Sequence, residues 1–296
     1  RPMQVTIRAE HLARTQCTLG EGPVWHDGAL WFVDIESRTL SRFANGAITS
    51  HDAGQRIGFA APTDANDWIV GLQQGLARFS PGKANPAIFA RPEPGKPDNR
   101  FNDAKADPKG RLYAGTMHMP CTEPMGTLYR LDDRPIPVVS GVTISNGLAW
   151  HEPSASMYYI DTPTRRVTRY DWNADTGDIT NPHTAIHFDE SQGSPDGMTI
   201  DRQGNLYIAM WGGSAVLVVD PVAGTIIETI AVNAPHVTSC TFGGPDLATL
   251  FITTARAGLS ADKLEANPRS GDLFTASIPG AQGLPVTPVN TSGLAK

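Results

Sequence analysis

One short pattern of residues returns six times along the chain and constrains its fold more than any other feature. Each copy has an apolar segment, a polar turn often of the form D-x-x-G, and a second apolar segment that begins with bulky residues. The copies begin at Gly22, Ala61, Asn102, Asn146, Asp196 and Cys240. Their spacing is roughly 40 to 50 residues, the length of one four-stranded β-propeller blade. The repeat therefore predicts a ring of six blades.

Two further strands are expected in each copy, in segments such as "TLSRFA", "GTLYRLD" and "RVTRYDW". Apolar and polar residues alternate there between Gly, Pro, Asn or Asp, as they do in half-buried antiparallel strands. We expect an all-β chain, with one six-bladed β-propeller domain over residues 1–296 and four-stranded antiparallel blades around a central channel. The segment "QVTIRAE", residues 4–10, lies outside the six copies. We predict that it closes the ring by joining the last blade beside "GDLFTASIP".

Charge and composition argue against several classes of function. The net charge is −6 and no stretch gathers Lys or Arg, so nothing matches the basic surface that binds nucleic acid or an anionic membrane. Asp220, Pro221 and Glu228 interrupt the most apolar region, residues 215–232, which falls short of the ~20 apolar residues of a spanning helix. Three widely separated cysteines give neither a disulfide framework nor a metal motif. With no secretory signal pattern at its start, we expect a cytoplasmic, monomeric protein.

Residues at the same phase of the repeat should meet at one mouth of the channel, because the first strand of every propeller blade lines the axis. The positions just before each innermost strand are Glu21, Gly58, Asn102 with Asp103, Asn146, Asp196 and Cys240. Asn and Asp before Gly are also ordinary turn residues. Glu21 is less easily explained in that way, because Glu is not a preferred turn former and this one lies between two glycines.

Convergence of Glu21, Asn146 and Asp196 on one axis would bury two carboxylates near each other, which is costly without a cation. Carboxylate and amide oxygens suit a hard divalent ion such as Ca²⁺, Mg²⁺ or Mn²⁺, while Zn²⁺ and Fe²⁺ stay open. His183 and His187 form no rival site, because in an extended strand they would lie ~13 Å apart. The sequence contains no serine-nucleophile elbow, phosphate loop or dinucleotide fingerprint.

Five segments in order resemble the regucalcin/gluconolactonase family of six-bladed propeller lactonases: "LGEGPVWHDGALWFVDI", "NRFNDAKADPKGRLYAGTM", "ISNGLAW", "SPDGMTID" and "VTSCTFGG". The resemblance runs from about Cys17 to Leu259. It implies one divalent metal ion, with calcium as the first choice, ligated by Glu21, Asn146 and Asp196. It further implies that Arg100 and Asn102 contact the substrate, and that Asp196 is also the general base.

The activity that the resemblance implies is hydrolysis of a small-molecule sugar lactone, such as glucono-, xylono-, arabinono- or galactonolactone, to the aldonic acid in bacterial sugar catabolism. "TMH", "MWGG" and "TTARAGLS" look similar to bacterial sugar-acid lactonases. Animal members have acidic residues after "AGTM", where this chain has His118, Met119 and Pro120. Two alternatives stay open: a propeller esterase or organophosphate hydrolase with the same axial ion, and a non-catalytic calcium-binding propeller.

The expected site also suggests how the reaction would run. Asp196 would take a proton from the water that attacks a metal-polarised lactone carbonyl, and Arg100 would offer fork-shaped donors to sugar oxygens. Most aromatic residues near the inner strands should pack between blades, and one should form an apolar wall of the sugar pocket. The aromatic residues considered for this wall are Trp25, Phe59, Trp150 and Trp211.

Overall fold

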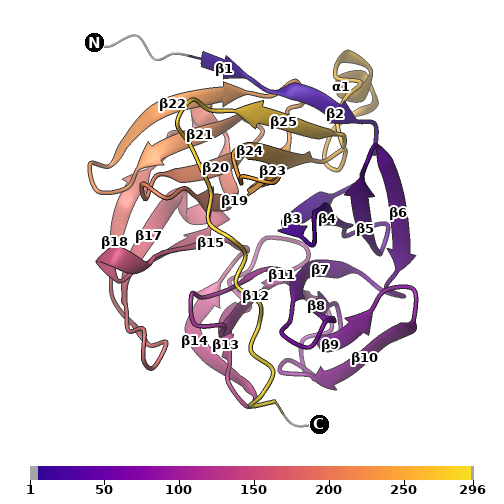
Figure 1. Cartoon of the computed structure of the whole chain (residues 1–296), viewed down its shortest axis with the longest axis vertical. Coiled ribbons are helices and arrows are strands. Elements are labelled where there is room, and N and C mark those ends of the chain that lie inside the picture. Colours follow the sequence, from indigo (N-terminus) through magenta and orange to yellow (C-terminus); the bar gives the residue numbers. More distant parts are fainter. Residues whose placement is uncertain (1–5, 295–296) are drawn as a thin grey trace.

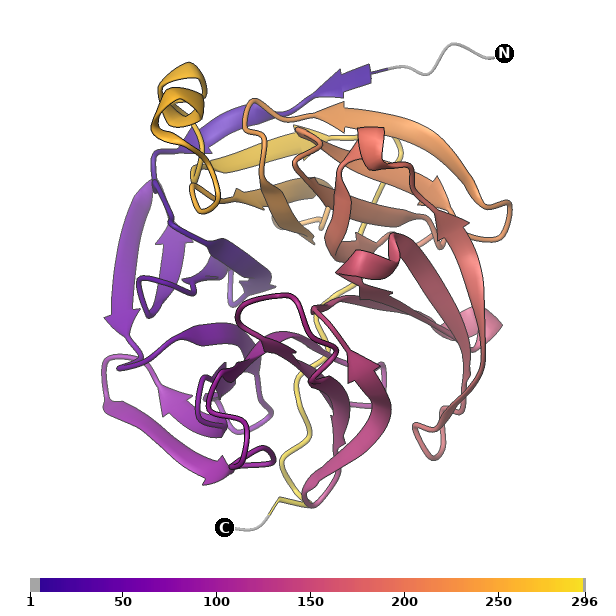
Figure 2. The same ribbon diagram turned by 180° about the vertical axis from the view of Figure 1, so that it is seen from behind.

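Six small sheets stand in a ring around a central channel in the computed structural model, which describes residues 6–294 (Figures 1 and 2). The first three blades, each given from the channel outward, are β3 (Gly20–His26), β4 (Ala29–Asp34), β5 (Thr39–Ala44) and β6 (Ala47–Asp52); β7 (Ile57–Pro62), β8 (Trp68–Leu72), β9 (Leu76–Ser80) and β10 (Ala84–Ala90); and β11 (Asn99–Ala106), β12 (Leu112–His118), β13 (Gly126–Leu131) and β14 (Pro135–Val142).

The fourth and fifth blades are β15 (Ser145–His151), β16 (Ser156–Asp161), β17 (Arg166–Trp172) and β18 (Ile179–His187); and β19 (Ser194–Ile200), β20 (Leu206–Trp211), β21 (Ala215–Asp220) and β22 (Thr225–Ala231). The sixth blade comprises β23 (Val237–Gly243), β24 (Thr249–Thr254), β25 (Leu273–Ser277) and β2 (Glu10–Ala13). Short helical segments are η1 (Glu152–Ser154), η2 (Thr162–Thr164), η3 (Glu190–Gln192) and α1 (Ala261–Ala266). The predicted all-β, six-bladed propeller is confirmed. Within residues 6–294, no helix combines the length and apolarity needed to span a membrane.

The N-terminal segment closes the ring, but of the described residues of "QVTIRAE" only Glu10 pairs with the last blade as predicted. β2 is the fourth strand of the last blade, where Glu10 pairs with Thr275 of β25. β1 (Thr6–Arg8), the middle of "QVTIRAE", instead pairs in parallel with β22 of the fifth blade. Residues 4 and 5 of that segment lie outside the described residues. The prediction was wrong for β1 because both blades offer an exposed strand edge, and the sequence pattern alone does not choose between two edges.

The D-x-x-G turns of the repeat are shaped by their own aspartates. Oδ1 of Asp107 accepts hydrogen bonds from the backbone N–H groups two and four positions later, and Oδ1 of Asp201 does the same in the fifth blade. Gly110 and Gly204 in these turns both have a φ of +87°, a conformation that glycine adopts at little cost. The repeat is visible in the sequence because this turn chemistry is shared between blades.

The hydrophobic core is divided into six clusters, one between each pair of neighbouring blades. Between the fourth and fifth blades, for example, Tyr158 and Ile160 pack against Met198 and Ile208. The innermost strands also contact their neighbours around the whole ring, and β3 contacts both β7 and β23. The channel wall, and any side chain that projects from it, is therefore held from both sides.

The C-terminal segment after β25, residues 282–294, crosses one mouth of the channel, and we call it the C-terminal strap (yellow in Figure 1). Gly283 forms a bridge with Asp201 of the fifth blade, and Val289 forms a bridge with Thr63 after β7. The backbone N–H of Asn290 donates to the carbonyl of Gly110 in the third blade. The strap thus ties together blades on opposite sides of the mouth where the innermost strands end.

Candidate functional site

Each innermost strand has an irregularity in its pairing close to its first residues. In all six blades the pairing of the innermost strand with the second strand shifts by a residue or more near the start of the innermost strand. Such a bulge bends the strand and redirects a side chain. Glu21, Asn146 and Asp196 lie within three of these shifts and Asn102 lies within a fourth, all at the mouth where the innermost strands begin.

The three predicted metal ligands are buried at this mouth. Glu21, Asn146 and Asp196 are only 4%, 3% and 7% exposed. A glycine follows each of them, and those after Asn146 and Asp196 allow the neighbouring blades to approach closely. A Cβ on Gly147 would lie 2.9 Å from the carbonyl oxygen of Asp196, so only glycine allows the fourth blade to come this near the fifth.

A row of side-chain hydrogen bonds orients Asn146. Arg100 donates through Nη1 to Oδ1 of Asn102 at 2.7 Å, and Nδ2 of Asn102 donates to Oδ1 of Asn146 at 3.0 Å. Nδ2 of Asn146 donates to Thr162 at 2.7 Å, and Thr162 donates to the Pro195 carbonyl at 2.8 Å. The structure therefore brings Arg100 and Asn102 together with Asn146. Thr162 was missed, because it follows β16 and lies outside the phase of the repeat that pointed to the other residues.

The charges of three buried acidic residues, Glu21, Asp103 and Asp196, act on one another within the channel. Burial raises the pKa of Asp196 to about 8. Burial, with the charges of Asp196 and Asp103, raises the pKa of Glu21 well above its usual range, and burial also raises the pKa of Asp103. Oδ1 of Asp196 is buried and has no hydrogen-bond partner among the described residues. Carboxyl groups in this setting need a proton or a cation.

The residues present fit a hard divalent cation. Two carboxylates and an amide oxygen are the kind of oxygen ligands that Ca²⁺ or Mg²⁺ takes, with water completing the shell. The described part of the chain contains no group of three or more His, Cys, Asp or Glu side chains arranged to hold a metal. Any cation held here would thus depend on Asn146 as well as on Glu21 and Asp196.

The remaining two positions at this phase of the repeat serve packing. A Cβ on Gly58 would lie 2.2 Å from the carbonyl oxygen of Phe101, so this glycine allows close contact between the second and third blades. Cys240 is buried, and its Sγ donates to the carbonyl of Tyr207 at 3.3 Å. Neither residue presents an oxygen ligand to the channel axis.

The aromatic residues considered as a sugar-binding wall divide between the two mouths. Trp211, the last residue of β20, pairs with the first residue of β19 and stacks on His236 with 3.9 Å between ring centroids. It therefore lies at the end of its blade where the innermost strands begin, the same end as the candidate site. Trp25, Phe59 and Trp150 line a cavity at the opposite mouth instead.

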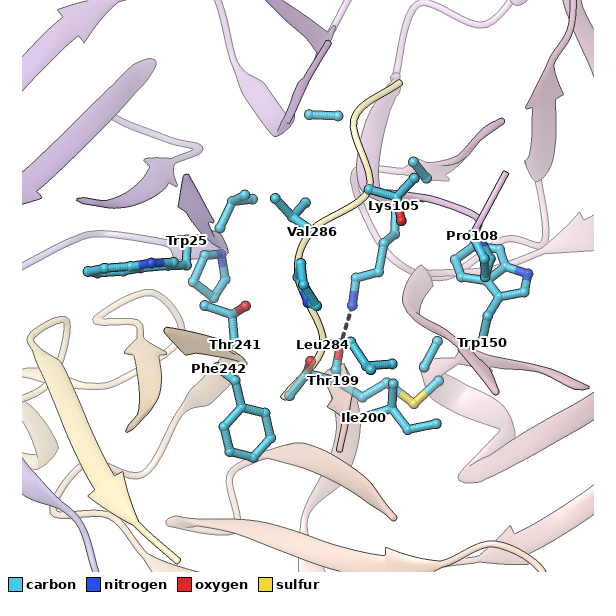
Figure 3. Close-up of a pocket in the computed structure, with 18 of the residues that line it drawn as sticks. Trp25, Lys105, Pro108, Trp150, Thr199, Ile200, Thr241, Phe242, Leu284 and Val286 are labelled. Atoms are coloured by element: carbon cyan, nitrogen blue, oxygen red, sulfur yellow. Dashed lines mark hydrogen bonds between the residues drawn. The ribbon is translucent and has the colours of Figure 1, made fainter. Parts of the chain in front are cut away.

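That opposite cavity has a volume of about 660 Å³ and reaches into the channel from the ends of the innermost strands. Figure 3 shows Leu284 and Val286 of the strap crossing it, with Phe242 and Trp150 among its walls. Nζ of Lys105 donates to the carbonyl of Met198 at 2.9 Å within it, the dashed line in Figure 3. This cavity opens at the other mouth from the candidate site, and Gly22 and Asp103, the sequence neighbours of Glu21 and Asn102, are among its lining residues.

Comparison with known proteins identifies the family. The family model described as "SMP-30/Gluconolactonase/LRE-like region" matches residues 19–256. The chain belongs to this family. Among curated relatives, a Bacillus subtilis protein named as a sugar lactone lactonase (YvrE) is 37% identical over 272 residues, which cover 90% of this chain and 93% of that protein. Regucalcin of Danio rerio is 33% identical over 288 residues, covering 95% of this chain and 97% of its own.

A solved structure supports the same assignment within the SMP-30/gluconolactonase family. The crystal structure described as a calcium-binding protein, regucalcin, from Agrobacterium tumefaciens matches with a TM-score of 0.91 and 27% identity, covering 96% of this chain and 98% of that one. These findings confirm the predicted family, and with it the prediction of a lactonase-type enzyme.

Proposed function

We propose that this protein hydrolyses a sugar lactone to the free sugar acid at the channel mouth where Glu21, Asn146 and Asp196 lie. The observation that supports this most is the convergence of two buried carboxyl groups and one clamped amide from three different blades. The relative named as a sugar lactone lactonase supports the substrate class, and its bacterial source supports a role in bacterial sugar catabolism.

We further propose that Glu21, Asn146 and Asp196 hold one divalent cation. The unpartnered Oδ1 of Asp196 and the raised pKa values of both acids support this, because a cation would compensate their charge. The solved relative described as calcium-binding favours calcium over Mg²⁺, Mn²⁺, Zn²⁺ or Fe²⁺. When bound, such an ion supplies Lewis-acid polarisation of a carbonyl oxygen.

The chain's own residues would perform the remaining work. Asp196 takes a proton from water as its oxygen adds to the lactone carbonyl carbon, and Oδ1 is free of competing hydrogen bonds. The ring C–O bond then breaks, and the ring oxygen takes up the proton held by Asp196 and leaves as a hydroxyl group. Arg100 would contact the sugar's oxygens, because guanidinium donors suit hydroxyl and carbonyl acceptors. Asn102, whose Nδ2 already donates to Asn146 and to the carbonyl of Ser145, would accept from a sugar hydroxyl through Oδ1.

A pH-indicator assay across five- and six-membered aldonolactones, paraoxon and aryl esters tests the proposal. We expect turnover of lactones, and a loss of at least about a hundredfold in kcat/KM in Asp196→Ala with the fold intact by circular dichroism. Asp133→Ala, at an exposed acid, should behave like the parent protein. Full activity in Asp196→Ala would refute the site. Preference for esters or paraoxon would indicate the esterase alternative, and no turnover at all would indicate a non-catalytic calcium-binding propeller.

Three further expectations remain predictions: a single domain, a monomer and a cytoplasmic location. A single cooperative thermal transition would support one domain. The elution volume on size exclusion would test the monomer, and cell fractionation would test the location.

A further inference from the structure

We propose that a second pocket, on the wall of the candidate site between the second and third blades, receives an anionic group on the exocyclic arm of the substrate. The preferred substrates would then be lactones of sugar acids whose arm ends in a carboxylate or a phosphate. This inference rests on the lactonase function proposed above and narrows its substrate class.

The pocket lies at the same mouth as the candidate site. It has a volume of about 460 Å³ and is formed by the loop between β8 and β9, the segment between β10 and β11, and the first residues of β11. Arg100 lines it, and the same guanidinium donates to Oδ1 of Asn102, which in turn bonds to Asn146. Arg100 is therefore common to the pocket and the candidate site, as a ligand that occupies both would require.

The lining is rich in positive charge without ion pairing. Arg91, Lys96 and Arg100 line the pocket, and none of them forms an ion pair with any described residue. Arg91 donates to the neutral Oε1 of Gln74 at 3.3 Å, and Lys96 donates to the carbonyl of Met125 at 3.0 Å. Their charges are thus available to an anion.

Glu93 is the single acid among the lining residues, and its oxygens are engaged by neutral donors. Oε1 accepts from Asn99 at 3.0 Å, while Oε2 accepts from Thr116 at 3.0 Å and from Tyr129 at 2.8 Å. Glu93 therefore fixes the wall rather than pairing with the arginines. Three positive groups against one negative group leave the lining with a surplus of two positive charges.

The pocket also contains an acceptor that no part of the described chain satisfies. Asn99 is only 3% exposed, and its Oδ1 is buried without a hydrogen-bond partner, while its Nδ2 is fully used by Glu93 and Met125. His118, which pairs with Asn99 across β11 and β12, likewise has an Nδ1 without a partner. Hydroxyl groups along a sugar-acid arm can supply donors, and an anionic end can take the charge-assisted hydrogen bonds of Arg91 and Lys96.

Matched substrates test this directly. Glucono-1,4-lactone and glucaro-1,4-lactone differ in a terminal carboxylate, and glucono-1,5-lactone and its 6-phosphate differ in a terminal phosphate. We expect at least one anionic lactone to have a kcat/KM tenfold or more above its neutral partner, and the arm that shows the effect identifies the anion. Because the contact is ionic and partly exposed, the preference should shrink as salt is raised.

Substitutions of the pocket's basic residues test whether the preference for anionic lactones comes from this pocket. Arg91→Met with Lys96→Met should lower kcat/KM for the anionic lactone by at least tenfold and lower it less for the neutral one. Arg91→Met alone, at an exposed position, serves if the double variant does not fold. Lys83→Met, at an exposed lysine of the same blade in the turn between β9 and β10, should leave both substrates unchanged.

Two outcomes would overturn the proposal, and they are distinguishable. Hydrolysis of neutral lactones with no preference for either anionic partner would reject the anionic pocket while the lactonase function stands. No hydrolysis of any lactone would reject the proposed function itself. Titration calorimetry with glucitol 6-phosphate, gluconate and uncharged glucitol then decides separately whether the pocket selects anions, and equal affinity for all three would reject it.

Discussion

Asn102 of the third blade donates a hydrogen bond of 3.0 Å to the side-chain oxygen of Asn146 in the fourth blade. The same Asn102 accepts from Arg100, so one amide connects the proposed substrate contact to the proposed cation ligand. Groups that orient a ligand in this way strongly influence the affinity of a metal site.

Replacing Asn102 with Ala should therefore weaken cation binding and lower kcat/KM, each by about 10- to 100-fold. The cause is the loss of the hydrogen bond that holds Asn146 in place. Calorimetric titration with Ca²⁺ and lactone kinetics measure the two effects. Asn85→Ala, at an exposed asparagine on β10, is the control and should match the parent protein. Unchanged cation affinity in Asn102→Ala would contradict this role.

The buried carboxyl group of Asp196 makes stability depend on pH when the cation is chelated. Its pKa is about 8 in the folded protein, against an ordinary value of 3.8, so between these pH values the folded state binds more protons than the unfolded state. The free energy of unfolding should then fall as pH rises from 5 to 8, by at most about 1.4 kcal/mol per pH unit for this group. Urea unfolding in the presence of a chelator measures the slope.

In the same experiment Asp196→Asn should show a shallower slope, with the remainder due to Glu21, whose pKa is also raised. Addition of Ca²⁺ at pH 8 should restore stability to the parent protein and not to the variant. A parent protein that gains stability between pH 5 and 8 without cation would contradict the buried acid pair.

Gly147→Ala should separate the fourth blade from the fifth. The added Cβ would lie 2.9 Å from the carbonyl oxygen of Asp196 and 2.8 Å from Cγ of Met198, so we expect a loss of about 1–3 kcal/mol in stability and weaker cation binding. Gly293→Ala, where an added Cβ meets nothing within 4 Å, is the matched control. Denaturant unfolding compares them, and equal stability of the two variants would show that the ring tolerates the added atom.

The C-terminal strap should contribute to stability through one buried side chain. Val289 is 1% exposed and packs against the cluster between the second and third blades, so Val289→Ala should cost about 2 kcal/mol. Val286→Ala in the same segment changes a side chain that is 37% exposed and should cost much less. A reversed order in denaturant unfolding would show that the strap is not anchored as described.

The phase of the repeat placed Glu21, Asn146 and Asp196 at one mouth, but it also included Asp103 and Cys240, which line the cavity at the opposite mouth. Glu21, Asn146 and Asp196 occupy equivalent places in three blades, and blades of one architecture place equivalent residues at the same depth. The glycine after each of them was also visible, but the structural reasons appear only in three dimensions: the close approach of the next blade at Gly147 and Gly197, and a φ of +53° at Gly22.

It was harder to predict at which mouth of the channel a side chain lies than to predict which innermost strands come together. Trp25 lies four residues beyond Glu21 on β3, about 13 Å further down an extended strand, and so belongs to the opposite mouth. Thr162 and β1 escaped prediction for another reason. Each takes its place through contacts between blades, and no local pattern records such contacts.

The pairing of β2 with β25 sets the order in which the molecule can be completed during synthesis. The strand that finishes the last sheet is made before the first blade, and its partner ends at Ser277. Until β25 has left the ribosome, β2 has no partner in the last blade, and that sheet lacks its two outer strands. The blade bearing Glu21 therefore gains its complete neighbour on that side only after the five blades before the last one have been made.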